Sequence, residues 1–172
     1  MGQVLEKSGE PSSSETENLG QEPRSIRRAA MDCLARREHS FFELTQKIQK
    51  KFPDRRPTEI LQTLEHLKAE DLQSDNRFVE SFVRIRKSRG FGIISIRESL
   101  KKKLISTTLI DQHLLSDDED WDRILRDQIQ RKLKNIKKLE FGNKEHLRLV
   151  RFLEGRGFPH TAIKKTLQAF FN

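Results

Sequence analysis

The sequence predicts an all-α protein, an elongated array of tandem three-helix repeats with about nine helices. Apolar residues recur at the three- and four-residue spacing of a helix face, and no segment shows convincing strand alternation. A break followed by such an apolar stripe occurs three times along the chain, as in a degenerate internal repeat. Apolar residues make up only 34% of the chain and charged residues 35%, which favours a row of small units over one large round core.

The repeated pattern is a turn that ends one helix and starts the next. Its central copy has the sequence Arg89-Gly90-Phe91-Gly92 and leads into a stripe that begins at Ile93. Gly90 can adopt the left-handed conformation that ends a helix without a Cβ penalty. The other copies break at Ser40, which can cap a helix, and at Pro159, whose φ is preset for one. In all three copies a basic residue lies four positions before the stripe: Arg37, Arg89 and Arg156.

The first repeat is predicted to span residues 24–73, after a disordered acidic tail over residues 1–23 that is rich in Ser, Glu, Gly and Pro. We expect helix one from about Arg24 to Arg37 and helix two from Phe41 to Lys51. Two prolines in the following loop disfavour helix, so helix three starts at Pro57 or Thr58.

The remaining helices fill approximate repeats over 74–116 and 117–172. In the second repeat, Ser74-Asp75-Asn76 caps helix four, helix five runs from Ile93 to about Lys103, and Ser106 or Thr107 caps helix six. In the third repeat, the acidic run Ser116-Asp117-Asp118-Glu119 opens a long helix seven that includes Ile136. Phe141-Gly142-Asn143 ends it, helix eight follows, and helix nine starts at Pro159.

The sequence contains no recognisable catalytic, metal-binding or cofactor-binding motif. The five histidines have no ligand spacing with one another or with the single cysteine, Cys33, and Asp117-Asp118-Glu119-Asp120 lacks the glycine and downstream Glu of a calcium loop. Phosphate loops, dinucleotide fingerprints and nucleophile elbows are also missing. We therefore expect a protein that is not an enzyme and that has no metal, cofactor or small-molecule substrate. Without a signal peptide or membrane-spanning run, we expect it to be cytoplasmic and not bound to membranes.

Basic residues provide the remaining functional signal. The formal net charge is +8, and since residues 1–23 carry −4, residues 24–172 carry +12. A body this basic indicates a polyanion partner, or a partner that itself holds one. The basic residues form three clusters, and each cluster lies near a helix C-terminus, where cations offset the helix dipole. Each cluster could therefore also be ordinary solvated surface. The predicted partner- or DNA-binding residues are Arg84, Arg86, Lys87, Arg89, Lys101, Lys102, Lys103, Arg131, Lys132, Lys134, Lys137 and Lys138.

Two details of these clusters can be checked against the fold. At helical spacing, Arg86 lies near Arg89, and Arg84 and Lys87 form a neighbouring pair, so that the four make one broad positive surface. Phe91 and Phe158 occupy matching turns, where each could stack on a base. We favour instead that they pack two helices together.

Four further blocks of the sequence stand out, in order over residues 24–172. They are Leu34-Ala35-Arg36-Arg37-Glu38-His39-Ser40, Asp75-Asn76-Arg77-Phe78, Arg89-Gly90-Phe91-Gly92 with Ile96-Arg97-Glu98-Ser99-Leu100, and Arg151-Phe152-Leu153-Glu154-Gly155-Arg156-Gly157-Phe158. Together these blocks resemble the RecX regulatory proteins of bacteria. The chain departs from the family pattern at Ile93, where Pro is usual, and at Leu104, where Gly is usual. Loss of that glycine removes a helix-ending signal and favours a helix five that runs on further.

The resemblance implies an elongated, curved helical protein that binds RecA recombinase filaments. Such a protein inhibits RecA's ATPase, strand-exchange and coprotease activities, restrains recombination and the SOS response, has no enzyme activity of its own, and can also bind single- or double-stranded DNA. The alternative that the residues leave open is a stand-alone DNA- or RNA-binding module, with Ser40–Lys51 or Ile93–Lys103 as a recognition helix.

Overall fold

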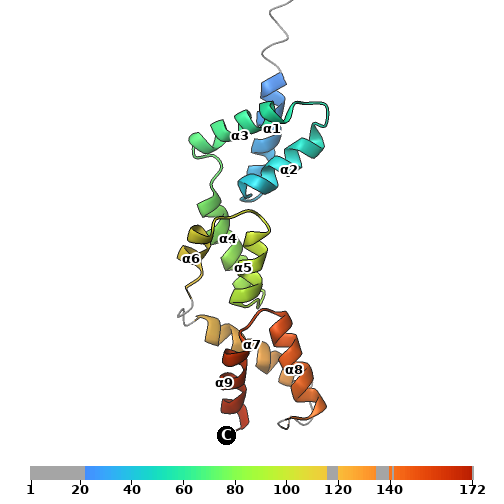
Figure 1. Cartoon of the computed structure of the whole chain (residues 1–172), viewed down its shortest axis with the longest axis vertical. Coiled ribbons are helices and arrows are strands. Elements are labelled where there is room, and N and C mark those ends of the chain that lie inside the picture. The colour runs from blue at the N-terminus through green and yellow to red at the C-terminus, as the bar shows by residue number, and fades with distance from the viewer. Residues whose placement is uncertain (1–21, 116–119, 135–139, 141, 172) are drawn as a thin grey trace, which may run out of the picture.

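The computed structural model describes residues 22–115, 120–134, 140 and 142–171, which form nine helices and no strand (Figure 1). The all-helical prediction is confirmed. No described helix is both long enough and apolar enough to cross a membrane. The helices are α1 (Glu22–Leu34), α2 (Phe41–Lys51), α3 (Pro57–Ala69), α4 (Asp75–Ser88), α5 (Ile93–Lys101), α6 (Thr107–His113), α7 (Asp120–Leu133), α8 (Lys144–Gly155) and α9 (His160–Phe171).

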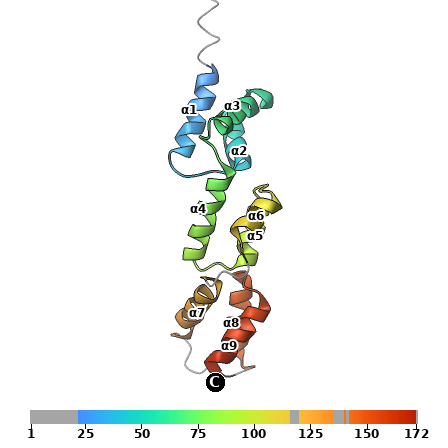
Figure 2. The same cartoon turned by 90° about the vertical axis from the view of Figure 1, so that its left-hand side faces the viewer.

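The nine helices form three groups of three that follow one another along a single long axis (Figures 1 and 2). We call α1–α3 unit 1, α4–α6 unit 2 and α7–α9 unit 3. Each helix packs mainly against the other two helices of its own unit. The protein is therefore an elongated array of tandem three-helix repeats, as the sequence predicts.

Side-chain caps start four of the helices where the sequence places capping residues. In each, a side-chain oxygen accepts a hydrogen bond from the backbone N–H three residues later, which satisfies one of the free donors of the first turn. These caps are Ser40, Ser74, Ser106 and Asn143. Gly92 precedes α5 in an extended conformation without a side-chain bond, and α9 starts directly after Pro159.

Two of the predicted helices have different bounds in the structure. Helix one begins at Glu22 and ends at Leu34, rather than running from Arg24 to Arg37. Helix five ends at Lys101 instead of running to Lys103 or beyond, because Leu104 takes the left-handed conformation at φ +55°. The amide of Ile105 donates to the carbonyl of Leu100 at 3.3 Å, so a glycine-type helix end forms here without a glycine.

Several sequence predictions lie outside the described residues. These are most of the tail over residues 1–23, the acidic run before α7, the extension of helix seven past Lys134, and Phe141 at its end. The repeat boundaries themselves stay a prediction.

The apolar side chains form two separate cores. One lies within unit 1 and includes Ala30, Leu44, Ile48 and Leu64, with half-buried Cys33 packed against it. The second runs without interruption from unit 2 into unit 3. Its fully buried members include Ile96 and Leu100 of α5, Leu125 and Ile129 of α7 and Leu153 of α8. Units 2 and 3 are therefore joined by apolar packing, whereas unit 1 meets unit 2 through polar contacts.

Replacing Leu104 by Gly should stabilise the protein. The Leu104 side chain is 69% exposed, so its loss removes little packing. A left-handed conformation costs a residue with a Cβ about 1–2 kcal/mol, and part of that gain is offset by the freedom of Gly in the unfolded chain. We expect urea denaturation to give a free energy of unfolding higher by about 0.5–1 kcal/mol for Leu104→Gly. Leu61→Gly, on the surface of α3, is the control and should cost about 1 kcal/mol. A loss of stability in both variants would contradict the strain at Leu104.

Candidate functional site

Units 2 and 3 meet where two glycine turns interlock through their backbones. The Gly92 amide donates to the Arg156 carbonyl at 2.8 Å, and the Ile94 amide donates to the Gly157 carbonyl at 3.0 Å. A Cβ added at Gly92 would lie 2.4 Å from the Gly157 oxygen, and one at Gly157 would lie 2.3 Å from the amide nitrogen of Ser95. Only glycines permit this approach. The turn before α5 and the turn before α9 therefore fix each other's position.

Basic and aromatic side chains stack across these turns. The Arg156 guanidinium lies over Phe91 at 4.9 Å and over Phe152 at 5.2 Å from the ring centroids, and its Nη1 donates to the Arg89 carbonyl at 2.7 Å. The Arg86 guanidinium lies over Phe82 at 5.1 Å and over Phe91 at 4.7 Å. Phe91 is thus held between one arginine from unit 2 and one from unit 3.

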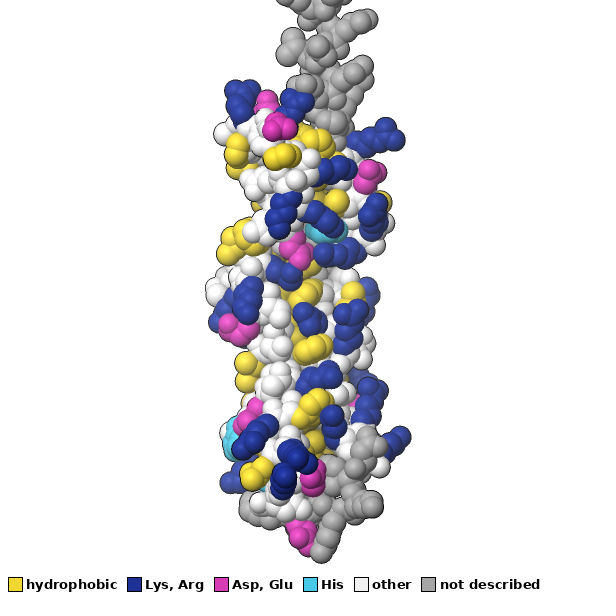
Figure 3. All heavy atoms as spheres, turned by 90° about the vertical axis from the view of Figure 1, so that its right-hand side faces the viewer, with side chains coloured by type: hydrophobic (Ala, Val, Ile, Leu, Met, Phe, Trp, Pro, Cys, Tyr) yellow, Lys and Arg dark blue, Asp and Glu magenta, His cyan; other side chains and the backbone are white. Residues whose placement is uncertain are grey.

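Two lysines extend this stack at its ends. Lys132 of α7 lies over Phe152 at 4.3 Å, and Lys103, just after α5, lies over Phe82 at 5.7 Å. Figure 3 shows basic and hydrophobic side chains alternating down the middle of this face of the molecule. We call this set the column, consisting in order of Lys103, Phe82, Arg86, Phe91, Arg156, Phe152 and Lys132.

The column suits a partner with repeated negative charges. A ring face attracts a cation and fixes the plane of a guanidinium, while the N–H groups at its edge can still donate to a carboxylate or phosphate. The stacked arginines lose less side-chain freedom on binding than free ones would. The ring faces are covered by cations of the chain itself, so stacking a base on Phe91 would first displace an arginine.

A groove of about 380 Å³ lies at the unit 1 end of the column, between α2, α4 and the turn after α5. Its lining combines Phe78, Phe82 and Ile85 with four cations: Arg37, Arg86, Arg89 and Lys103. We call it the joint groove.

Glu43 of α2 forms an ion pair with Lys103, and its carboxylate accepts from Arg37 at 3.3 Å. Burial alone would raise the pKa of Glu43, but hydrogen bonds and attraction from Lys103 and Arg37 hold that pKa below its usual value.

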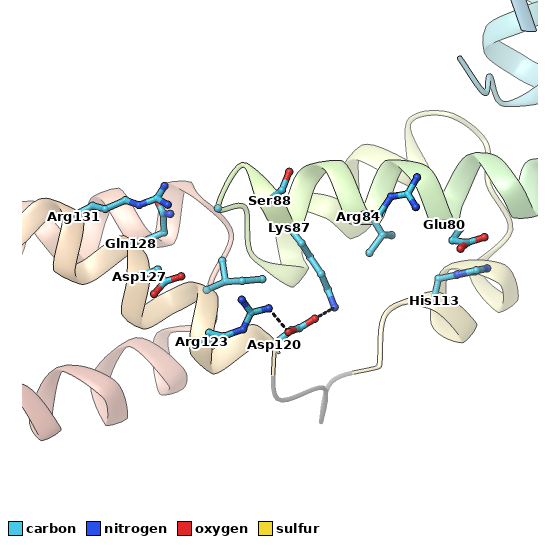
Figure 4. Close-up of a pocket in the computed structure, with 13 residues that line it drawn as sticks. Glu80, Arg84, Lys87, Ser88, His113, Asp120, Arg123, Asp127, Gln128 and Arg131 are labelled. Carbon is cyan, nitrogen blue, oxygen red and sulfur yellow. Dashed lines mark hydrogen bonds and ion pairs between the residues drawn. The ribbon is translucent and has the colours of Figure 1, made fainter. Parts of the chain in front are cut away.

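The opposite side of α4 has a different chemistry. A hollow of about 630 Å³ between α4, α6 and α7 is lined by charges of both signs (Figure 4). Asp120 accepts from Lys87 at 3.5 Å and from Arg123 at 2.5 Å. The Arg123 hydrogen bond, with attraction from Lys87, lowers the pKa of Asp120. Arg84 and Arg131 also line this hollow. Its cations share the lining with the carboxylates of Glu80, Asp120 and Asp127, so it is less suited than the column to a polyanion.

The joint between units 1 and 2 is a buried polar network. His39 is 1% exposed, and its Nδ1 lies 2.9 Å from the Arg37 carbonyl, which can only accept, so Nδ1 carries the proton. Its Nε2 accepts from Lys47 at 3.2 Å. Gln73, also buried, donates to the His39 carbonyl at 3.2 Å and to Asp75 at 3.0 Å. Burial, with repulsion from Arg37 and Lys47, lowers the pKa of His39, so the ring is held neutral.

Comparison with known proteins assigns the chain to a family. The family model for RecX, second three-helix domain, matches residues 74–114. The regulatory protein RecX of Pseudomonas savastanoi pv. phaseolicola is 38% identical over 146 residues, which cover 84% of this chain and 91% of that protein. The regulatory protein RecX of Ectopseudomonas mendocina is 39% identical over 147 residues, covering 85% and 95%. The chain belongs to the RecX family.

A solved structure of RecX supports the same fold. RecX from Lactobacillus salivarius superposes with a TM-score of 0.73 at 20% identity, covering 87% of this chain and 96% of that one. At this identity the likeness concerns the arrangement of helices.

The predicted site residues of this RecX chain fall on different surfaces. Arg86 pairs in space with Arg89, and Arg84 with Lys87, but the two pairs line hollows on opposite sides of α4. The single broad surface expected there is therefore wrong. Of the other predicted residues, Lys103 and Lys132 lie at the two ends of the column, and Arg131 lines the mixed-charge hollow. The exposed ones are Lys101, Lys102 and Lys134, and those outside the described residues are Lys137 and Lys138.

Sequence reasoning did not assign Arg156, Phe82 or Phe152 to this surface, and it favoured a packing role for Phe91. Arg156 occupies the same position in the repeated turn as Arg89, and this equivalence could have identified it from the sequence. The buried Phe158 and half-buried Phe91 pack helices together, as expected. In the part of the chain described, no group of three or more His, Cys, Asp or Glu side chains is placed to hold a metal ion.

Gly92→Ala should destabilise the RecX chain strongly. The new methyl would meet the Gly157 carbonyl, so the two backbones must separate, at a cost of roughly 2–3 kcal/mol. Gly155→Ala is the matched control in the same protein, since a Cβ there meets nothing within 4 Å. In that helix position, Ala should be neutral or stabilising by up to about 1 kcal/mol. Thermal denaturation checks both, and equal melting temperatures would refute the interlocked turns.

Stability should fall as the pH drops below about 6.5, the ordinary pKa of histidine. The fold lowers the pKa of His39, so between that lowered value and 6.5 the unfolded chain binds more protons than the folded one. The stabilisation is complete above 6.5 and is lost as the pH falls through the folded pKa. Urea denaturation at pH 7.5 and 5.5 measures the difference. His39→Gln should reduce that difference, and an unchanged pH dependence in the variant would assign the effect to other groups.

Proposed function

We propose that the chain binds the RecA nucleoprotein filament and inhibits its ATPase, recombinase and coprotease activities, and so modulates DNA repair and the SOS response in the cytoplasm. It would act by binding alone, without catalysis of its own. Membership of the RecX family supports this proposal, and so does the shape of the molecule. Helices α4 and α7 are each about 21 Å long at 14 residues, so three units in a row can reach several subunits of a filament.

The observation that carries the proposal is the alignment of the column on one face across two units. A filament repeats its surface and its DNA along its axis, so a partner that lies along it needs contacts repeated in the same direction. The column supplies four cations in sequence, two of them arginines with fixed planes. Single- or double-stranded DNA in the filament, or acidic side chains of RecA, would provide the anions.

The rival function, a recognition helix in a DNA groove, is less compatible with the fold. Recognition helices contact base edges with their N-terminal residues. The N-terminus of α5 is bonded to the turn before α9, through the amides of Gly92 and Ile94. At α2, the Phe41 amide donates to Asp75 of the next unit at 2.8 Å, and Ser40 is buried. Neither terminus is open to a base.

Charge reversal on the column should weaken inhibition of RecA. We expect Arg86→Glu with Lys132→Glu to raise the concentration for half-inhibition of RecA's single-strand-dependent ATPase by about tenfold or more, since each lost charge contact costs on the order of 1 kcal/mol. Arg84→Glu with Arg131→Glu is the matched control. It changes the same two helices by the same charge, on the mixed-charge hollow, and should stay within about twofold. Equal inhibition by both folded variants would exclude the column as the interface.

The same variants separate DNA from protein contacts. If phosphates are the anions, binding to a fluorescent single-stranded oligonucleotide without RecA should have a salt dependence flatter by about 0.7–0.9 per lost contact in the column variant. If RecA side chains are the anions, binding of the column variant to DNA-free RecA should weaken while oligonucleotide binding is unchanged.

A further inference from the structure

The joint groove combines an apolar floor with a basic rim. Phe78 is buried, but Ile85 is 44% exposed, although it lies between charged residues. On the rim, Lys103 and Arg37 are paired with Glu43. Arg89 has no carboxylate partner among the residues that the structure describes, and Arg86 is held only by aromatic rings. The groove therefore suits an acidic segment that also carries an apolar side chain.

We propose that this occupant is the N-terminal segment of the same chain, residues 1–21. These residues contain four glutamates and one lysine. The glutamates are Glu6, Glu10, Glu15 and Glu17. Val4 and Leu5 directly precede the first of them, so apolar and acidic side chains are adjacent. In the docked state, Leu5 covers Ile85 and the glutamates neutralise Arg86 and Arg89.

The segment is long enough to reach the groove. It joins the fold at Glu22, at the N-terminus of α1, whereas Arg37 of the groove follows the other end of that helix. Thirteen helical residues make α1 about 20 Å long, and Ile85 lies about 15 Å further along α4 from Asp75, so the span to Ile85 is about 35 Å. The stretch from Leu5 to Glu22 has an r.m.s. span of roughly 23 Å as a flexible coil, and can extend to about 55 Å. The span is longer than this r.m.s. length but well within the full extension, so the segment reaches the groove at an effective concentration below the maximum for a matched linker.

Docking of this segment would make the chain self-inhibiting. Arg86 and Lys103 belong both to the groove and to the column. A segment bound in the groove therefore blocks access of a polyanion to that end of the column. A segment bound about two-thirds of the time lowers the apparent affinity of the column about threefold. This consequence rests on the proposed function, whereas the docking itself does not.

Disulfide trapping tests the docking directly in the full chain. In a Cys33→Ala background, Leu5→Cys is combined with Ile85→Cys in the groove. The control combines it with Ile94→Cys, which is similarly exposed at 49% but does not line the groove. We expect intramolecular cross-linking to be about tenfold faster for the groove pair at low salt, and this advantage to shrink at 0.5 M salt, as screening shortens the reach of the charges. Equal rates, or cross-links that form between two chains through Ile85→Cys, would overturn the proposal.

A second measurement separates this proposal from the proposed function. Replacing Glu6, Glu10, Glu15 and Glu17 by Gln should remove the cross-linking advantage of the groove pair. The same replacement, with native Leu5, Cys33 and Ile85, should lower the concentration for half-inhibition of RecA's ATPase about threefold. Inhibition of RecA with equal cross-linking rates would leave the proposed function standing and exclude the docking. Fast cross-linking of the groove pair in a chain that does not inhibit RecA would support the docking and exclude the proposed function.

Discussion

The interlocking of two glycine turns is the constraint on which the proposed binding face depends. Backbone hydrogen bonds from Gly92 and Ile94 to the turn at Gly157 bring α5 and α9 to a distance that no side chain at either glycine would allow. This contact fixes the position of unit 3 relative to unit 2. Arg156 can then reach the Arg89 carbonyl and share Phe91 with Arg86, so a backbone contact determines where the charged side chains lie.

The same repeated turn gives a different joint at the other end of unit 2. There Ser40 stands in place of Gly92, and the contact across the joint consists of His39, Gln73 and Asp75 with ion pairs such as Glu38–Arg77 at 2.9 Å. No apolar core crosses this joint, whereas one core runs through units 2 and 3. Polar joints respond to salt and pH more than apolar ones do. We therefore expect the attachment of unit 1 to be more sensitive to salt and pH than the apolar contact between units 2 and 3.

Much of the fold follows from local signals in the sequence. Ser40, Ser74 and Ser106 cap helices because their side chains need only a neighbouring amide, and the positive φ of Gly90 follows from its place after a helix. The end of helix five was predicted wrongly because Leu104 takes a left-handed conformation that a residue with a Cβ does not prefer. The division of Arg84 and Arg86 between two surfaces depends on which helices lie on each side of α4, which residue spacing alone does not contain. Arg156 joins the site across 67 residues of sequence from Arg89, so only the fold brings it there.

The claim that the column is the binding face is tested most directly by an electron cryomicroscopy reconstruction of the chain on a RecA filament assembled on single-stranded DNA. The account predicts that Arg86, Arg156 and Lys132 face the filament, with unit 2 and unit 3 in contact along its groove. A reconstruction in which the hollow lined by Arg84 and Arg131 faces the filament, and the column faces solvent, would contradict it.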